Sequence, residues 1–245
     1  LILVALIFRS VAFEFRSKMD SKTWRSNWDL ALSLGSFVPA LLFGVAFGNL
    51  IKGVPIDDKM EFVGNFFSLL QPFALLTGIL GLVFFLYHGS VFITLKTTGD
   101  LNSRAQALSK KLGLASLILW VVVVVASFLA LESKPLMIVF AVLATVALLA
   151  SIFFQNKGQN GKAMIANAAT TLTVVGAFFA GLYPNVMVSS LTAANNLTVS
   201  NASSTPYTLK VMTIVAVTVL PFVLGYQAWT YYVFRKRVTA DKLEY

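Results

Sequence analysis

Residues 208–235 have the sequence TLKVMTIVAVTVLPFVLGYQAWTYYVFR, which is apolar over most of its length. Aromatic residues gather near the end of this stretch, and Lys236 and Arg237 follow Arg235 directly. An apolar run of about 20 residues is long enough to cross the hydrocarbon core of a bilayer as a helix. The order apolar, aromatic, basic is typical of a helix that leaves the membrane on its cytoplasmic side. The stretch therefore predicts a membrane-spanning helix, with a proline kink at Pro221.

The composition of the whole chain agrees with a membrane protein. Of its 245 residues, 58% are hydrophobic and only 12% are charged, whereas soluble domains carry about 25% charged residues. The net charge of +9 comes from short basic clusters between apolar runs, which indicates membrane topology and not a surface for nucleic acid. The chain has no cysteine, so a disulfide framework, a thiolate metal site and a cysteine nucleophile are excluded.

Apolar runs of helical length recur along the chain and predict an all-α, polytopic transmembrane helical bundle of about seven spans. The chain begins with Leu1 inside an apolar run, so we expect further helices to precede it in the natural protein. We interpret residues 1–245 as a single transmembrane helical domain. The predicted spans are 1–14 (truncated), 28–51, 66–95, 112–131, 136–154, 164–183 and 208–234.

Basic residues are concentrated in alternate loops. Most of them lie in the predicted loops 15–27, 96–111 and 155–163 and in the C-terminal tail, which includes Lys242. Loops rich in Lys and Arg face the cytoplasm in membrane proteins. This rule predicts a cytoplasmic C-terminus and places residue 1 near the outer face. The uncharged loop 185–207 is then expected outside.

Two glycines in the second predicted span, Gly44 and Gly48, form a GxxxG pattern. Small residues at this spacing let the backbones of two helices approach closely. We expect them to pack this span against another helix of the same chain, in preference to a second copy.

Two charged residues of the first span could form a buried pair. Arg9 lies inside the apolar run, and Glu14 follows near the same side of the helix. A charged side chain at the centre of a bilayer costs about 3 kcal/mol on insertion scales. One interpretation is a pair that fixes a subunit interface or lines a polar path. The alternative is that Arg9 reaches an outer headgroup and Glu14 lies at the inner interface.

His88, the only histidine of the chain, lies late in the third span. Three roles are open from the sequence. The imidazole could ligate a haem iron, it could carry protons because its pKa lies near neutrality, or it could form a hydrogen bond that packs helices. The sequence favours the structural role, with membership of a proton path as the second interpretation.

Three further charged residues are candidates for a proton path or a structural role. Asp100 and Arg104 are spaced i, i+4 in the predicted loop after the third span, which favours an exposed pair. Asp29 lies near the start of the second span, where an acid favours a helix N-terminus. We find no hydrolase triad, phosphate loop or metal motif, so no catalytic, cofactor-binding or metal residue is predicted on this chain.

Four segments, taken in order, resemble subunit II of cytochrome bd quinol oxidase. They are 8–16 (FRSVAFEFR), 88–105, which contains HGS and LKTTGDLNSRA, 182–184 (LYP) and 208–237. The segments are spread over the whole chain, and none of them is a general membrane pattern. Subunits of this family have nine spans, so the resemblance implies that two helices precede Leu1.

The resemblance implies a terminal oxidase of the prokaryotic plasma membrane that oxidises quinol, reduces oxygen to water and generates proton-motive force. It places the b-type and d-type haems and the quinol site on a larger subunit I. This chain would be the haem-free partner, in contact with subunit I, membrane lipid and quinone. The resemblance is also compatible with a small accessory subunit. No nucleic-acid partner is expected.

Two other classes fit the residues alone. A secondary transporter would use broken helices at the midplane of the membrane. Pro39, Pro72 and Pro221 could break helices, but acidic residues inside the spans are nearly absent. A purely structural membrane scaffold is the third interpretation, and it overlaps with the role of an oxidase subunit.

Overall fold

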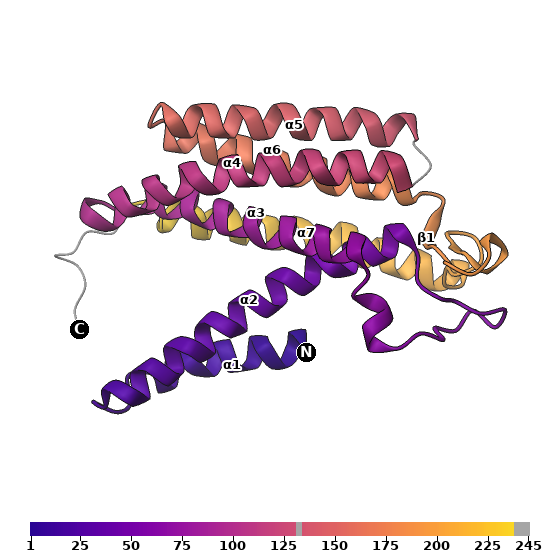
Figure 1. Cartoon of the computed structure of the whole chain (residues 1–245), viewed down its shortest axis with the longest axis horizontal. Helices are drawn as coiled ribbons and strands as arrows, with labels where there is room; N and C mark the ends of the chain where they lie inside the picture. Colours follow the sequence, from indigo (N-terminus) through magenta and orange to yellow (C-terminus); the bar gives the residue numbers. More distant parts are fainter. Residues whose placement is uncertain (131–133, 238–245) are drawn as a thin grey trace.

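The structure, a computed structural model, describes residues 1–130 and 134–237 and consists mainly of long helices (Figure 1). Lys242 and the last residue of the predicted span 112–131 lie outside the described residues. The helices are α1 (Ile2–Phe15), α2 (Lys22–Lys52), α3 (Pro72–Lys96), α4 (Gly99–Ala130), α5 (Pro135–Asn156), α6 (Asn160–Leu182) and α7 (Pro206–Val233), with short 3-10 turns η1 (Phe66–Leu69) and η2 (Ala193–Asn195). Two short strands, β1 (Asn185–Met187) and β2 (Leu197–Thr198), pair antiparallel.

Among the described residues, the six helices from α2 to α7 are long and apolar enough to cross a membrane. The predicted all-α transmembrane bundle is confirmed. The count of seven spans differs because α1 has 14 residues, which extend only about 21 Å, less than the roughly 30 Å of a bilayer core. The expected nine spans and the division into a single domain stay predictions.

Helices α2 and α6 begin at Lys22 and Asn160, before the predicted starts at 28 and 164. Two other predicted boundaries are wrong, each for a local reason. The predicted span 66–95 begins too early, because residues 66–69 form the separate turn η1 and α3 begins only at Pro72. Proline suits the first position of a helix, where the backbone nitrogen has no hydrogen bond to donate. The predicted loop 96–111 is mostly helix, since the chain turns only at Gly99, whose φ is +73°. Helix α4 therefore begins at Gly99 and runs beyond its apolar part.

Helices α2 and α3 approach each other closely through their glycines. A Cβ atom added at Gly44 would lie 2.5 Å from the carbonyl oxygen of Thr77 and 2.8 Å from the Cα atom of Gly78. The Thr77 hydroxyl donates to the carbonyl oxygen of Gly44 at 2.9 Å. Gly48 faces Ala74 on the same side of α3. The GxxxG pattern thus packs two helices of one chain, as expected.

Helices α3 to α6 form a four-helix bundle with its own core. The buried apolar residues of that core come from all four helices: Tyr87, Val91, Trp120, Ala144, Leu148 and Ala163. At the opposite end of the bundle from the α5–α6 turn, the Lys134 ammonium donates to the carbonyl oxygens of Gly181 and Tyr183. A lysine at this place satisfies carbonyls that the end of a helix leaves unpaired. It ties the start of α5 to the end of α6.

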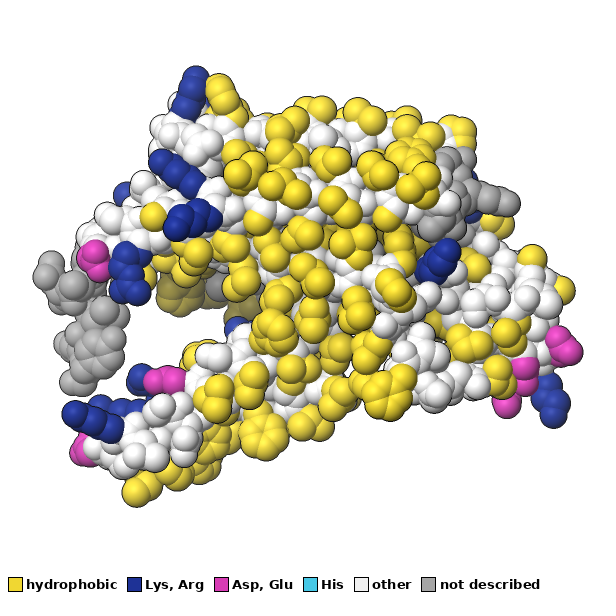
Figure 2. Space-filling view, viewed as in Figure 1, with side chains coloured by type: hydrophobic (Ala, Val, Ile, Leu, Met, Phe, Trp, Pro, Cys, Tyr) yellow, Lys and Arg dark blue, Asp and Glu magenta, His cyan; other side chains and the backbone are white. Residues whose placement is uncertain are grey.

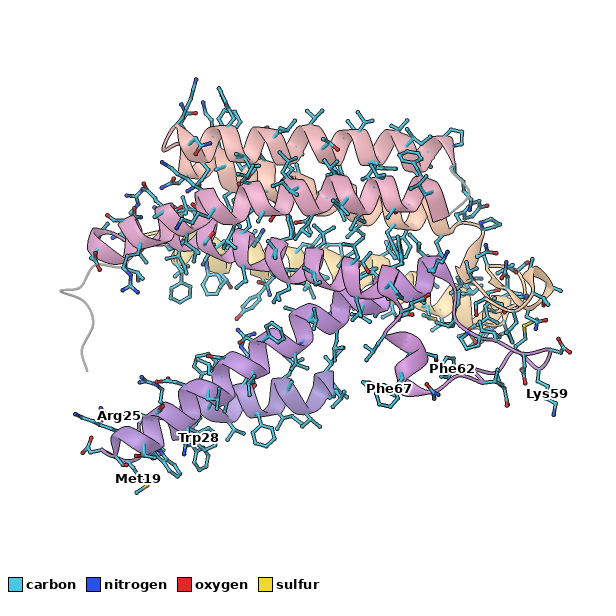
Figure 3. All side chains as sticks on the ribbon, in the orientation of Figure 1. Met19, Arg25, Trp28, Lys59, Phe62 and Phe67 are labelled. Atoms are coloured by element: carbon cyan, nitrogen blue, oxygen red, sulfur yellow. The ribbon has the colours of Figure 1, made fainter. Side chains whose placement is uncertain are left out.

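Charged side chains gather toward the ends of the helices and leave an apolar middle (Figure 2). The α1–α2 turn, the start of α4 and the α5–α6 turn lie at the same end of the molecule (Figure 1). The predicted basic loops therefore share one side. At the α1–α2 corner, Arg25 and Trp28 lie near Met19 (Figure 3), and the Trp24 indole nitrogen donates to the carbonyl oxygen of Phe15 at 2.8 Å.

Candidate functional site

A cluster of polar side chains lies inside the α3–α6 bundle, toward the end that carries the basic loops. We call it the polar seam. Its members are Tyr87, His88 and Thr94 on α3, Ser109 on α4, Ser151 and Gln155 on α5, and Asn160 and Asn167 on α6. All of them are buried except His88, which is half-buried. Polar groups inside a membrane-spanning bundle are costly unless they are paired, so such a cluster is a candidate for function.

The deep end of the polar seam is a pair of side chains from α3 and α6. The Nδ1 atom of His88 lies 2.6 Å from the Oδ1 atom of Asn167. Because an amide oxygen only accepts hydrogen bonds, Nδ1 carries the proton in this arrangement. Asn167 has no solvent exposure. This hydrogen bond is what a helix-packing role of His88 requires, whereas the proton-path role stays a prediction.

A second link joins α3, α5 and α6 beside this pair. The Tyr87 hydroxyl lies 2.8 Å from the Ser151 hydroxyl, and the Ser151 hydroxyl donates to the carbonyl oxygen of Ala163 at 3.0 Å. Tyr87 is completely buried. Gly113 on α4 makes room for the ring, since a Cβ there would lie 3.1 Å from it.

The remaining members lie at the basic end of the bundle, near the first turns of α4 and α6. Gln155 donates to the Ser109 hydroxyl at 2.8 Å. Asn160 donates to the carbonyl oxygen of Thr94 at 3.2 Å, and the half-buried Asn102 donates to the same oxygen at 2.7 Å. The seam therefore begins where side chains reach the surface.

Sequence reasoning found only His88 among these residues. A signal was present, because Ser151 and Gln155 are four residues apart and Asn160 and Asn167 are seven apart, so each pair lies on one face of its helix. Polar residues that recur on one face of an apolar helix indicate a polar interior. The partners across helices do not follow from this spacing.

Beside the seam lies an apolar cavity of about 240 Å³ between α2 and the α3–α6 bundle. Its walls are mostly phenylalanine, valine and glycine, with Ser116 and Thr170 at the side of the seam. Met137 is the only residue of the lining that could ligate iron, and His88 is not part of the lining. Within residues 1–130 and 134–237, no three His, Cys, Asp or Glu residues form a group that could hold a metal ion.

The structure places the other predicted site residues at the surface. Arg9 and Glu14 are both exposed on α1, and no ion pair joins them among the described residues. The described part of the chain therefore does not form the buried pair, and a role of these two residues in such a pair or at a subunit interface stays a prediction. Arg104 lies 4.0 Å from Asp100 in an exposed pair at the start of α4.

Asp29 has a partner that sequence reasoning did not foresee. The Arg16 guanidinium contacts its carboxylate through two nitrogens, at 2.5 and 3.2 Å. The pair is about half exposed and joins the end of α1 to the first turns of α2. Such fork-like pairs fix geometry as well as adding energy. Asp29 thus connects two helices and does not act only on the helix N-terminus.

Long apolar helices, charged ends and a paired polar interior define a polytopic integral membrane protein. The model of the cytochrome bd terminal oxidase subunit II family matches residues 1–234. The cytochrome bd ubiquinol oxidase subunit 2 of Bacillus subtilis is 41% identical over 98% of this chain and 72% of the relative. The chain therefore belongs to the cytochrome bd oxidase subunit II family, and it is a subunit of an oxidoreductase complex.

Two further comparisons agree. The probable cytochrome oxidase subunit 2 of Haemophilus influenzae is 34% identical over 94% of this chain and 71% of the relative. The structure of bd oxidase from Geobacillus thermodenitrificans matches with a TM-score of 0.71 at 14% identity, over 95% of this chain and 71% of that one. The second comparison establishes the fold alone.

Proposed function

We propose that the chain acts as the haem-free second subunit of a quinol:oxygen oxidoreductase in a bacterial plasma membrane. A haem-bearing larger subunit oxidises quinol and reduces oxygen to water, and the complex generates proton-motive force. The b-type and d-type haems and the quinol site belong to that partner, and a third, small subunit is compatible with this arrangement. Quinone and membrane lipid surround the complex. The basic end of the molecule faces the cytoplasm, together with the C-terminus.

The observation that carries the haem-free role is the placement of the only histidine. His88 bonds Asn167 inside the polar seam, and it does not line the apolar cavity beside the seam. The walls of that cavity are apolar and offer one thioether, that of Met137, as a soft ligand. A b-type haem is held by nitrogen or thioether ligands from the protein. One histidine outside the cavity supports a structural role and not axial ligation.

We expect the His88→Ala variant of the purified complex to keep every haem band of the wild type. Because His88 is the only histidine, any haem that this chain ligates through an imidazole would be lost in this variant. The variant should be less stable, by about 1–3 kcal/mol, since Asn167 loses its partner in a buried site. The measurement is the reduced-minus-oxidised absorption spectrum, normalised to protein.

His88→Gln is the matched variant, because its side-chain amide can still bond Asn167. Oxidase activity of the two variants across pH, normalised to haem, separates the remaining roles. Equal profiles for the wild type and both variants leave the structural role. A pH profile that shifts in both supports the proton-path role, and loss of a haem band in either one makes His88 a ligand and contradicts the proposal.

A further inference from the structure

Four buried polar atoms inside the α3–α6 bundle make no hydrogen bond of normal geometry with the described part of the protein. They are the Ser116 hydroxyl oxygen, Gln155 Oε1, Asn160 Oδ1 and Asn167 Nδ2. Three of the four belong to the polar seam, and Ser116 lies on α4 where the apolar cavity begins. Unpaired buried polar atoms are rare in folded proteins, and buried water most often supplies the missing bond.

The lack of partners does not depend on how the side-chain amides are turned. The orientation of Asn160 is fixed, because only its amino group can bond the carbonyl oxygen of Thr94. Turning the amide of Gln155 or Asn167 exchanges its two ends but still leaves one of them without a protein partner. Each of these three side chains therefore has capacity for one more hydrogen bond.

The unpaired atoms are ordered along the seam by chemical type. With the Asn167 amide turned so that its Oδ1 atom bonds His88, Gln155 and Asn160, near the basic end, present acceptors, and Asn167, deeper in the bundle, presents a donor. Asn160 and Asn167 are seven residues apart on α6, which is about 10 Å along the helix. Thr94 and Tyr87 have the same separation on α3. A file of about three waters, which makes four hydrogen bonds of about 2.8 Å each, spans this distance.

The hydrogen bonds of such a file would all donate in one direction, from Asn167 toward the entrance at the basic end. The water nearest Asn167 accepts from its amino group and donates onward, and the water nearest the entrance donates to the carboxamide oxygens of Asn160 and Gln155. Polar side chains lie beside the whole route, since Tyr87 and Ser151 occupy the middle. At the entrance, Asn102 is half-buried and Gln106 donates to its Oδ1 atom at 2.8 Å, so water can enter from the surface.

We propose that water molecules bind along the polar seam and connect the basic end of the α3–α6 bundle with Tyr87 and His88. The middle of the face shown in Figure 2 is apolar, so the seam would be a hydrated interior behind an apolar surface. This inference does not rest on the proposed function, because the bound water can be detected whatever reaction the complex performs.

Hydroxyl-radical labelling by X-ray pulses tests the proposal in the intact membrane complex. Radicals formed from bound water modify the side chains next to that water, even when these side chains are buried. Trp120 is the internal reference, because it is 7% exposed and its indole bonds Thr145 outside the seam. We expect Tyr87, with no exposure, to be labelled faster than Trp120 although an indole is intrinsically more reactive than a phenol. Labelling of Tyr87 no faster than that of Trp120 overturns the proposal, and this comparison needs no variant.

Two variants sharpen the test. Asn160→Leu and Asn167→Leu each remove one anchor of the water file, and either should lower labelling of Tyr87 about fivefold through loss of one hydrogen bond. Thr145→Val is the matched control, since it removes a polar partner outside the seam and should leave the absolute labelling rate of Tyr87 unchanged. Trp120 does not serve as the reference in this variant, because it loses its bond to Thr145. If either leucine variant does not assemble, the shorter Asn160→Ser, which is expected to admit more water, should raise the labelling. Labelling that none of these seam variants changes overturns the proposal.

Discussion

The Arg9→Leu variant should fail to assemble with the partner subunit, or should assemble with far lower yield than the wild type. Arg9 lies seven residues before Arg16 on α1, which is about 10 Å deeper along the helix axis. Its side chain is exposed within the chain, and a charge that faces lipid at such depth costs several kcal/mol. We therefore expect a partner surface that carries an acid to cover it. If the acid stays buried without Arg9, the loss is about 3–5 kcal/mol.

The measurement is the amount of partner that co-purifies with the variant, together with oxidase activity per complex. Arg9→Lys keeps the charge and should recover part of the assembly. Arg104→Leu is the control, because the Arg104 side chain is 77% exposed at the start of α4 and should be neutral. Normal assembly and full activity of Arg9→Leu would show that no buried pair forms at this position.

The Gly44→Ala variant should be clearly less stable than the wild type, whereas Gly89→Ala should not. A Cβ at Gly44 meets backbone atoms of α3 at 2.5 and 2.8 Å, and backbone cannot turn aside as a side chain does. Overpacking of this kind costs about 1–3 kcal/mol. A Cβ at Gly89 meets nothing within 4 Å, and alanine is favoured over glycine in a helix by up to about 1 kcal/mol.

The readout for this pair is the apparent melting temperature of the purified complex. A loss of 1 kcal/mol lowers it by about 2–4 °C for a chain of this size, so Gly44→Ala should melt several degrees below Gly89→Ala. Equal melting temperatures would mean that α2 and α3 do not pack through these glycines.

Some of the architecture was predictable because a bilayer imposes simple rules. A span must be apolar for about 20 residues, so the bounds of α5 and α7 follow from the sequence to within two residues. The boundaries that failed depend on local chemistry. Hydropathy does not show that Pro72 starts a helix, nor that the polar start of α4 stays helical because Asn102 bonds the end of α3.

The candidate site was largely hidden from the sequence. His88 was visible because it is the only histidine, but its partner Asn167 is 79 positions away and is brought close only by the packing of α3 on α6. Asn167, Ser151 and Gln155 are single polar residues in apolar runs, and each is unremarkable until the four helices come together. The Arg16–Asp29 pair was missed for the same reason, since the turn between α1 and α2 sets it.

The central claim is that this chain is the second subunit of a haem-bearing quinol oxidase. Purification through an affinity tag on this chain, followed by a reduced-minus-oxidised spectrum and an assay of quinol-driven oxygen consumption, tests it most directly. We predict that a larger subunit co-purifies, with b-type bands and a d-type band in the red, and that the complex consumes oxygen with quinol. A tagged chain that purifies from native membranes without any haem-bearing partner and without quinol oxidase activity would contradict the claim.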